Sequence, residues 1–266
     1  MKPLRATVEG IGFWTNGLPS WQAARAYANG GALVADAPAR PSPQLLAPNE
    51  RRRAPEPVAV ALETSLAACA QAGRDPAALP SVFVSARGDL AITDYMCTTL
   101  ATDPRGLSPT RFHNSVHNAA AGYWTIGAGV MQPATALCAG EASFAQGLIE
   151  ALVQLASGAD AVLLAAYDCA AVGPLVQVVP SEGLLGGALV LSRHARADAP
   201  ILEAVLGEAP ATNAAPGPLS QHAARNGMAP MLPVFDALAR NGVRGTSDAA
   251  ILPAGAGRTL TVRIHW

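Results

Sequence analysis

Residues 134–166 constrain the fold of this chain more than any other stretch. The segment opens with an apolar run at 134–138, turns at Ala139-Gly140, and closes with a second apolar run at 160–166. The residues in between place large apolar side chains at helical spacing on one face, at Phe144, Leu148, Leu152 and Leu155. Two unbroken apolar strands around an amphipathic helix are typical of a sheet that is covered on both faces. The stretch therefore predicts an α/β fold.

Capping residues, glycines and prolines divide the rest of the chain into further elements. Ser20 is well placed to cap a short helix, and Gly186-Gly187 inside one strand indicate the close approach of another backbone. The pattern predicts helices at 20–28, 58–72, 91–101, 113–124, 141–157 and 231–240. It predicts additional strands at 4–12, 81–86, 184–191, 201–206 and 260–264, and loops at 29–57, 169–183 and 207–227.

The composition excludes several classes of protein. The chain has 266 residues, of which 50% are apolar and 14% charged, so it can bury a large core and is not a disordered chain. A formal net charge of −1 without a long basic run argues against nucleic-acid binding. The richest apolar segment, 142–166, contains Glu150 and Asp160, so we expect no membrane span.

The cysteines lie far apart and form no CxxC pair, which argues against a zinc site or a disulfide framework. They are Cys69, Cys97, Cys138 and Cys169. Reduced, buried thiols are the default for such a pattern, and the N-terminus lacks the build of a signal peptide. We therefore expect a cytoplasmic protein.

The turn at Ala139-Gly140 matters chemically because a helix follows it. The free backbone N–H groups and the dipole at a helix N-terminus favour a thiolate, an oxyanion or a carboxylate. The residue presented there decides which chemistry the turn supports.

Three short patterns carry a resemblance to a known family. They are Trp14…Pro19…Trp21, Asn118-x-x-Ala121-Gly122-x-x-x-Ile126 and Gly158-Ala159-Asp160-Ala161-Val162. In these patterns the chain resembles the β-ketoacyl synthases, thiolase-fold condensing enzymes that activate a nucleophilic cysteine on such a turn. It is most similar to chain-length-factor-like subunits that pair with an active ketosynthase, especially those of aryl-polyene pathways. The resemblance covers about residues 1–192.

The resemblance implies a mixed central sheet with covering helices, mostly one half of the duplicated thiolase-like fold. Residues 1–192 are expected to form the thiolase-like N-terminal half, and residues 193–266 a short remnant of a truncated second half. A complete ketosynthase places two catalytic histidines in its second half, within His-Gly-Thr and after Asn-x-Phe-Gly-Phe-Gly-Gly. Neither motif occurs after residue 192.

The spacing of the family motifs assigns the nucleophile position to a residue without sulfur. Counting forward from Asn118 places it on Glu141, and counting backward from Asp160 places it on Gly140. Cys138 lies two or three residues earlier, inside the predicted strand, where an inert core thiol is expected. The resemblance thus implies a subunit with no catalytic residue. Glu141 is then either a fixed anion at the helix N-terminus or an ordinary first-turn acid.

The remaining predicted sites concern partners. Asn118, Tyr123, Trp124 and Glu141 are candidates for a pocket at a subunit interface, although Tyr123 and Trp124 could equally be packing residues. Arg51, Arg52 and Arg53 are candidates for contact with an acidic acyl carrier protein, or a solvated helix entry. His113 and His117 would share a helical face, but no third ligand is near, so we predict no metal and no cofactor.

The leading hypothesis is a non-catalytic, chain-length-factor-like subunit that forms a heterodimer with a full-length ketosynthase, acts with an acyl carrier protein, and helps to set the length of carrier-bound polyene chains. A second hypothesis is a truncated acyltransferase or ketosynthase that uses Cys138 as nucleophile, with His113, His117 or His222 as base. A third is a homodimeric small-molecule binding protein that keeps the fold without chemistry. Native mass spectrometry with and without a co-expressed ketosynthase separates the first hypothesis from the third, and labelling or acylation of Cys138 tests the second.

Overall fold

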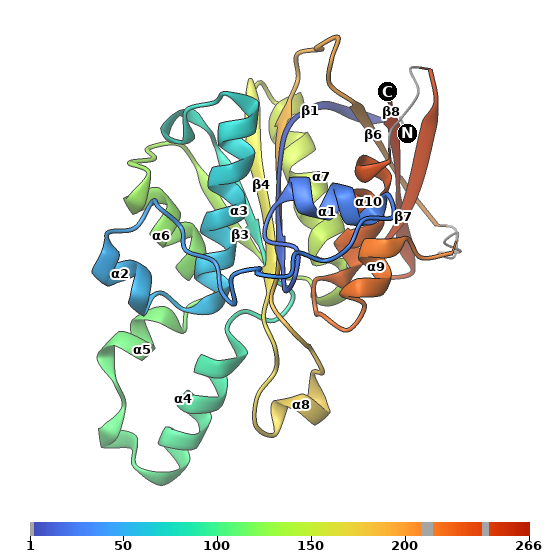
Figure 1. Ribbon diagram of the computed structural model, residues 1–266. Helices are drawn as coiled ribbons and strands as arrows, with labels where there is room; N and C mark the ends of the chain where they lie inside the picture. Colours follow the sequence, from blue (N-terminus) through green and yellow to red (C-terminus); the bar gives the residue numbers. More distant parts are fainter. Residues whose placement is uncertain (1–2, 209–214, 241–244) are drawn as a thin grey trace.

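A computed structural model describes residues 3–208, 215–240 and 245–266. Its centre is an eight-stranded sheet in the order β3-β2-β4-β5-β1-β6-β8-β7 (Figure 1). The pairs β2–β3 and β2–β4 are parallel, and the other neighbours are antiparallel. The strands are β1 (Leu4–Thr15), β2 (Ser81–Val84), β3 (Ala134–Leu137), β4 (Ala161–Asp168), β5 (Leu185–Ser192), β6 (Ile201–Gly207), β7 (Ser247–Gly255) and β8 (Arg258–His265). The predicted α/β class with a mixed central sheet is confirmed.

Helices cover both faces of the sheet (Figure 1). Val162 and Leu164 of β4 join a core with α1, α7 and α10, whereas Leu163 and Ala165 join a core with α3 and α6 on the other face. The α-helices are α1 (Trp21–Ala28), α2 (Pro48–Arg53), α3 (Glu56–Ala72), α4 (Leu90–Thr102), α5 (Pro109–Asn114), α6 (Ala119–Gly127), α7 (Ser143–Ala156), α8 (Leu175–Val178), α9 (Pro218–His222) and α10 (Leu232–Ala239). The 3-10 helices are η1 (Pro76–Ala78), η2 (Pro104–Gly106), η3 (Gly140–Ala142) and η4 (Ala229–Met231). Because both faces are covered, every residue of β4 is buried, as its apolar run predicts.

Glycines in β1 allow α3 to lie close against the sheet. A Cβ added at Gly10 would lie 2.1 Å from Ala68 O, and one at Gly12 would lie 1.9 Å from Thr64 O. Both distances are far shorter than any van der Waals contact, so only glycine fits at these two positions. The predicted close approach at Gly186 and Gly187 is also present, although the nearest atoms there belong to side chains of α3 and α10.

The segment after residue 192 continues the same sheet. β6 pairs with β1 over Leu4–Thr7, β8 pairs with β6, and β7 forms the far edge. Phe235 of α10 packs within 5.5 Å of the Phe13 ring and 6.1 Å of the Trp21 ring. The two predicted segments, 1–192 and 193–266, therefore share one sheet and one of its cores.

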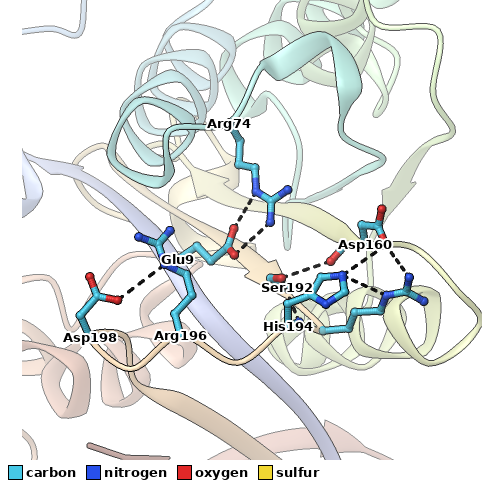
Figure 2. A network of polar contacts seen from close by, with 8 residues as sticks. Glu9, Arg74, Asp160, Ser192, His194, Arg196 and Asp198 are labelled. Carbon is cyan, nitrogen blue, oxygen red and sulfur yellow. Dashed lines mark hydrogen bonds and ion pairs between the residues drawn. The ribbon is translucent and has the colours of Figure 1, made fainter.

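A polar network lies at the end of the sheet where β4 begins (Figure 2). Arg74, just beyond α3, forms two hydrogen bonds of 2.7 and 3.0 Å with the carboxylate of Glu9. Asp160, just before β4, contacts Arg193 at 2.6 Å and His194 at 3.4 Å. The network joins the segment after α3 to the middle of β1, the start of β4 and the end of β5.

The predicted helix at 113–124 is interrupted. α5 ends at Asn114 and α6 starts at Ala119. The Ser115 hydroxyl donates to Phe112 O at 2.8 Å and thereby satisfies a carbonyl at the end of α5. His113 and His117 consequently lie in different local structures and do not share a helical face.

Three predicted loops contain short helices, and one strand was not predicted. α2, α8 and α9 lie within the predicted loops at 29–57, 169–183 and 207–227, and they are only four to six residues long. Such segments lack the length for a recognisable apolar period. Residues 209–214 of the last loop lie outside the described residues. β7 was missed because Pro253 and Gly255 interrupt its alternation.

Candidate functional site

The turn between β3 and α7, residues 139–142, forms a sharp elbow. Gly140 adopts a φ of +57°, which glycine reaches without strain. The buried Ser143 hydroxyl accepts a hydrogen bond from Ala139 N at 2.8 Å and donates to Gly140 O at 2.7 Å. Ser143 therefore closes the elbow with its side chain. The sequence analysis missed this role, although serine near a helix start commonly bonds to local backbone groups.

Glu141 is the charged residue of the elbow, and its side chain is exposed. It lies in η3 and lines a cavity of about 510 Å³. The other walls of the cavity carry Arg87, Glu182 and Arg225, and the last two form an ion pair of 2.6 Å. The dipole at the start of a helix stabilises a carboxylate in this place. The elbow thus presents an anion that cannot carry an acyl chain as a thioester.

Cys138 directly precedes the elbow, and its side chain is exposed. The expectation of a buried core thiol is wrong for this residue because β3 is an outer strand of the sheet, which leaves its side chains partly uncovered. The Cys138 thiol donates to Ala86 O at 3.4 Å, and a carbonyl neighbour does not stabilise a thiolate. Cys97 is exposed as well. Cys69 and Cys169 are buried, and burial raises the pKa of both thiols to about 12.

A buried carboxylate close to the elbow escaped the sequence analysis. Asp168 ends β4 with no exposed surface, and it accepts hydrogen bonds from Ser85 Oγ at 2.5 Å, Ala86 N at 3.0 Å and Arg87 N at 3.3 Å. Burial raises the pKa of Asp168 to about 6, while these hydrogen bonds oppose the rise. The available signal was an acid placed directly after a fully apolar strand.

The turn that follows β2 connects this carboxylate to the elbow. Ser85 O lies 3.2 Å from His117 Nε2 and 3.5 Å from the Ser143 hydroxyl. The next carbonyl, Ala86 O, accepts the hydrogen bond from Cys138. A single turn therefore contacts the buried carboxylate, the elbow and the segment between α5 and α6.

A groove of about 530 Å³ opens between α2, α5 and α6. Asn118 and Tyr123, two of the predicted pocket residues, both line it. The Tyr123 hydroxyl donates to Asn114 Oδ1 at 3.2 Å. Trp124 turns away into the core, where its ring lies 6.2 Å from that of Phe83. The structure thus brings Asn118 and Tyr123 together, and places Trp124 in the core and Glu141 in the cavity at the elbow.

An open apolar surface adjoins the groove, and we call it the outer face. It comprises the free edge of β3 together with Phe112, Val116, Ile126 and Met131. Along this edge no strand of the described residues pairs with β3, whose other edge pairs with β2. Ile126 and Met131 are 84% and 94% exposed. An unpaired edge with large exposed apolar side chains marks a site of protein association.

The predicted basic cluster lies at the end of α2 rather than in a loop. Arg51 donates to Leu46 O at 2.9 and 3.3 Å, so its guanidinium serves the local backbone. Arg52 contacts Asn49, and Arg53 is exposed. Arg52 and Arg53 are the members of the cluster that remain accessible to a partner.

The three histidines considered as bases or metal ligands contact different parts of the molecule. His113 lines the groove, His117 contacts Ser85 O, and His222 Nε2 lies 2.9 Å from Asn16 O. In the part of the chain that the structure describes, no three histidine, cysteine or acidic side chains gather closely enough to hold a metal ion. Nor does any helix there combine the length and apolarity needed to cross a bilayer.

The sequence comparison defines the class of protein. Residues 21–241 match the model of the beta-ketoacyl synthase, N-terminal domain. The chain therefore belongs to this family, and the match extends across residue 192. No curated protein sequence matches the chain.

Solved structures with the same fold include chains from ketosynthase complexes. A chain of the ketosynthase ApeO in complex with its chain length factor ApeC, from Xenorhabdus doucetiae, superposes with a TM-score of 0.74 at 21% identity, over 97% of this chain and 99% of that chain. The ishigamide ketosynthase/chain length factor gives 0.71 at 15% identity, over 98% and 99%. A type II polyketide acyl-carrier protein in complex with its ketosynthase, AntDE:AntF, gives 0.73 at 14% identity, over 100% and 99%. The fold is thiolase-like, as the sequence resemblance implied.

Proposed function

We propose that this chain is a non-catalytic, chain-length-factor-like partner of a β-ketoacyl-[acyl carrier protein] synthase in polyene or fatty-acid-like biosynthesis, of the aryl-polyene kind. The observation that carries the proposal is the elbow, because the family motifs assign the nucleophile position to Glu141 or Gly140, and neither residue carries sulfur. The likeness of the fold to chains from ketosynthase and chain-length-factor complexes supports it.

The chemistry of condensation explains why the elbow is decisive. Decarboxylative condensation needs a thiolate that holds the acyl chain, and donors that stabilise the enolate and the thioester oxyanion. A carboxylate at the elbow supplies neither function. The chain therefore contributes to synthesis through a partner that carries the nucleophile.

The outer face supports an association with such a partner. Ile126 on α6 and Met131 just before β3 are both almost fully exposed, and one edge of β3 is free. A stable complex would pair this edge and bury these side chains, which together lower the free energy of association. The groove with Asn118 and Tyr123 opens beside the same face, so it is placed to contribute to a pocket between subunits.

The proposed partners are a full-length ketosynthase in a cytoplasmic heterodimer and an acyl carrier protein. Arg52 and Arg53 are the accessible cations at the end of α2 for an acidic carrier protein. Attraction of this kind raises the rate of encounter more than the final affinity. The nearly neutral net charge gives no reason to propose a nucleic-acid partner.

The alternative, catalysis by Cys138, is favoured by one observation, the exposure of its side chain. Its hydrogen bond goes to a carbonyl, and no histidine among the described residues is hydrogen-bonded to its sulfur. Peptide mass spectrometry after incubation with acyl thioesters separates the two proposals. An acyl adduct on Cys138 would support catalysis by this chain and contradict its role as a non-catalytic subunit.

The test is co-expression with a full-length ketosynthase from the same genome, followed by native mass spectrometry. We expect a complex with one copy of each subunit, and at least tenfold weaker association for Ile126→Asp and Met131→Asp. Val153→Asp is the matched control, because Val153 is an exposed apolar residue on α7, which covers the sheet away from the groove.

Activity provides the second half of the test. Glu141→Ala should leave the rate of product formation by the complex within about twofold of wild type, since the elbow takes no part in bond formation. A soluble monomer that does not bind the ketosynthase would contradict the proposal. So would a complex in which Glu141→Ala abolishes product formation.

A further inference from the structure

The carboxylate of Asp168 is a buried acidic group that the proposed function does not use. It is fully buried, and its three hydrogen-bond donors are the Ser85 hydroxyl and two backbone amides. None of these donors is a cation, so the hydrogen bonds to the carboxylate come from neutral groups alone. Asn226 donates to the backbone oxygen of Asp168 at 3.4 Å, which brings the loop before η4 to the same place.

The donors all belong to the turn after β2, which reaches two other regions through its carbonyls. Ser85 directs its hydroxyl to the carboxylate and its carbonyl toward His117 and Ser143. Ala86 directs its amide to the carboxylate and its carbonyl to Cys138. Any rotation of these two peptide units changes both sets of contacts together.

Few other charged or titratable groups lie near Asp168 and the turn after β2. Arg87 is the cation whose charge reaches it, and its side chain is exposed. Tyr167, on β4, and Cys169, just after it, adjoin Asp168 and interact with Asp89 at the start of α4. Burial raises the pKa of both, so neither ionises near neutrality. Glu141, Glu182 and Arg225 lie in the neighbouring cavity.

We propose that Asp168 is a proton-operated latch that sets the conformation of the 85–88 turn and, through it, both the exposure of Cys138 beside the elbow and the seat of His117 next to the outer face. Mild acidification adds one proton from solvent to the carboxyl group. The elbow and the segment around His117 at the border of the outer face then change conformation together.

The atoms define what the proton changes. The ionised carboxylate accepts from Ser85 Oγ, and Ser85 Oγ in turn accepts from Gly88 N at 2.7 Å. Once protonated, the Asp168 hydroxyl donates to Ser85 Oγ, so the direction of that hydrogen bond reverses and the Ser85 proton turns elsewhere. Arg87 N then loses Asp168 Oδ1 as an acceptor and keeps only the long contact of 3.4 Å with Ser85 Oγ, so the turn loosens at this residue.

The two exposed cysteines provide the measurement. Cys138 contacts the turn, whereas Cys97 lies on α4 and serves as an internal reference in the same protein. Alkylation of both sites by iodoacetamide is followed by peptide mass spectrometry between pH 5 and 8, on the purified chain in whatever assembly it adopts. We expect the ratio of the Cys138 rate to the Cys97 rate to change at least threefold, with a midpoint near pH 6, and to stay constant in Asp168→Asn.

Two further variants keep the proposal falsifiable. Ser85→Ala retains the carboxylate but removes the hydroxyl whose bond reverses, so it should reduce the change in ratio to less than half. Histidine also exchanges protons near neutrality, and His117→Gln should retain the full change. A constant ratio in wild type, or a change that persists in Asp168→Asn and disappears in His117→Gln, would overturn the latch. The experiment does not depend on a ketosynthase, so it can fail while the proposed partnership stands.

Discussion

Two buried carboxylates at opposite ends of the sheet show two ways of placing an anion inside this fold. Glu9 lies in the bulge of β1 beside Ser192, and Asp168 lies at the far end of β4, opposite Leu185. Glu9 meets the guanidinium of Arg74 in paired hydrogen bonds (Figure 2). Asp168 meets only a hydroxyl and two amides.

The consequence is a difference in the sign of the pKa shift. Burial alone would raise the pKa of Glu9, but the hydrogen bonds and charge of Arg74 outweigh it, and the pKa falls. At Asp168 burial outweighs the hydrogen bonds, and the pKa rises to about 6. A cation therefore makes Glu9 a permanent structural anion, while its absence leaves Asp168 able to exchange a proton near physiological pH. The first end stabilises the fold, and the second adjoins the elbow.

The largest expected effect is at the Glu9 end. Arg74→Ala leaves the Glu9 carboxylate without its cation in a partly buried site, and the loss of such charge-assisted hydrogen bonds costs about 2 kcal/mol. Urea unfolding at pH 7.5 measures the change in the free energy of unfolding. The double variant Glu9→Gln/Arg74→Ala should recover at least half of the loss, because it removes the stranded charge. A double variant no more stable than Arg74→Ala would show that Arg74 acts through packing instead.

The pH dependence of stability gives the next effect, with opposite signs at the two ends. Because the pKa of Asp168 is higher in the folded chain than the ordinary 3.8, its contribution is fully present below pH 3.8 and is lost as the pH rises through about 6. The pKa of Glu9 is lowered from 4.5, so its contribution is present above pH 4.5 and is lost as the pH falls through the lowered value.

Unfolding of wild type and Asp168→Asn at pH 5 and 7.5 isolates the first of these contributions. Relative to the variant, we expect wild type to lose about 1.4 kcal/mol between these pH values, because pH 5 lies about one pH unit below the folded pKa of about 6 and one such unit corresponds to about 1.4 kcal/mol. Glu9→Gln, the matched control, should be less stable than wild type by a constant amount at pH 5 and 7.5, and this difference should shrink only as the pH falls below 4.5. Parallel curves for wild type and Asp168→Asn would mean that the carboxylate titrates alike in the folded and unfolded chain.

The regular parts of the fold followed from the sequence because local and tertiary preferences agree there. Ser20 accepts a hydrogen bond from Ala23 N at the start of α1, as its position predicts. Phe144, Leu148, Leu152 and Leu155 are all buried on one face of α7. In both cases the residues that decide the structure are neighbours in the sequence, so their spacing is sufficient.

The candidate site followed only in part because its geometry depends on which strand lies at the edge. Cys138 looked like a core residue from its apolar neighbours, and its exposure results from the position of β3 outside β2. Trp124 looked available for a pocket, but the rotation of α6 turns it inward. The contacts of Asp168 join segments 81 to 83 residues apart, and no local pattern encodes them. The motif spacing nevertheless placed Glu141 and Gly140 on the turn that became the elbow.

The smallest expected effect tests whether ion pairing as such distinguishes the two ends, or whether burial is required. Arg193 and Asp160 belong to the same polar network as Glu9 and form an equally short contact of 2.6 Å, but both side chains are largely exposed (Figure 2). Water and salt screen such a pair, and ordering two exposed side chains opposes the attraction. Arg193→Ala should therefore leave the urea midpoint unchanged within error at pH 7.5, in low salt and in 0.5 M salt alike. A loss of stability comparable to that of Arg74→Ala would show that the whole network stabilises the fold cooperatively. The two ends of the sheet would then differ because Glu9 belongs to a charged cluster and Asp168 is isolated, and not because Glu9 alone has a cationic partner.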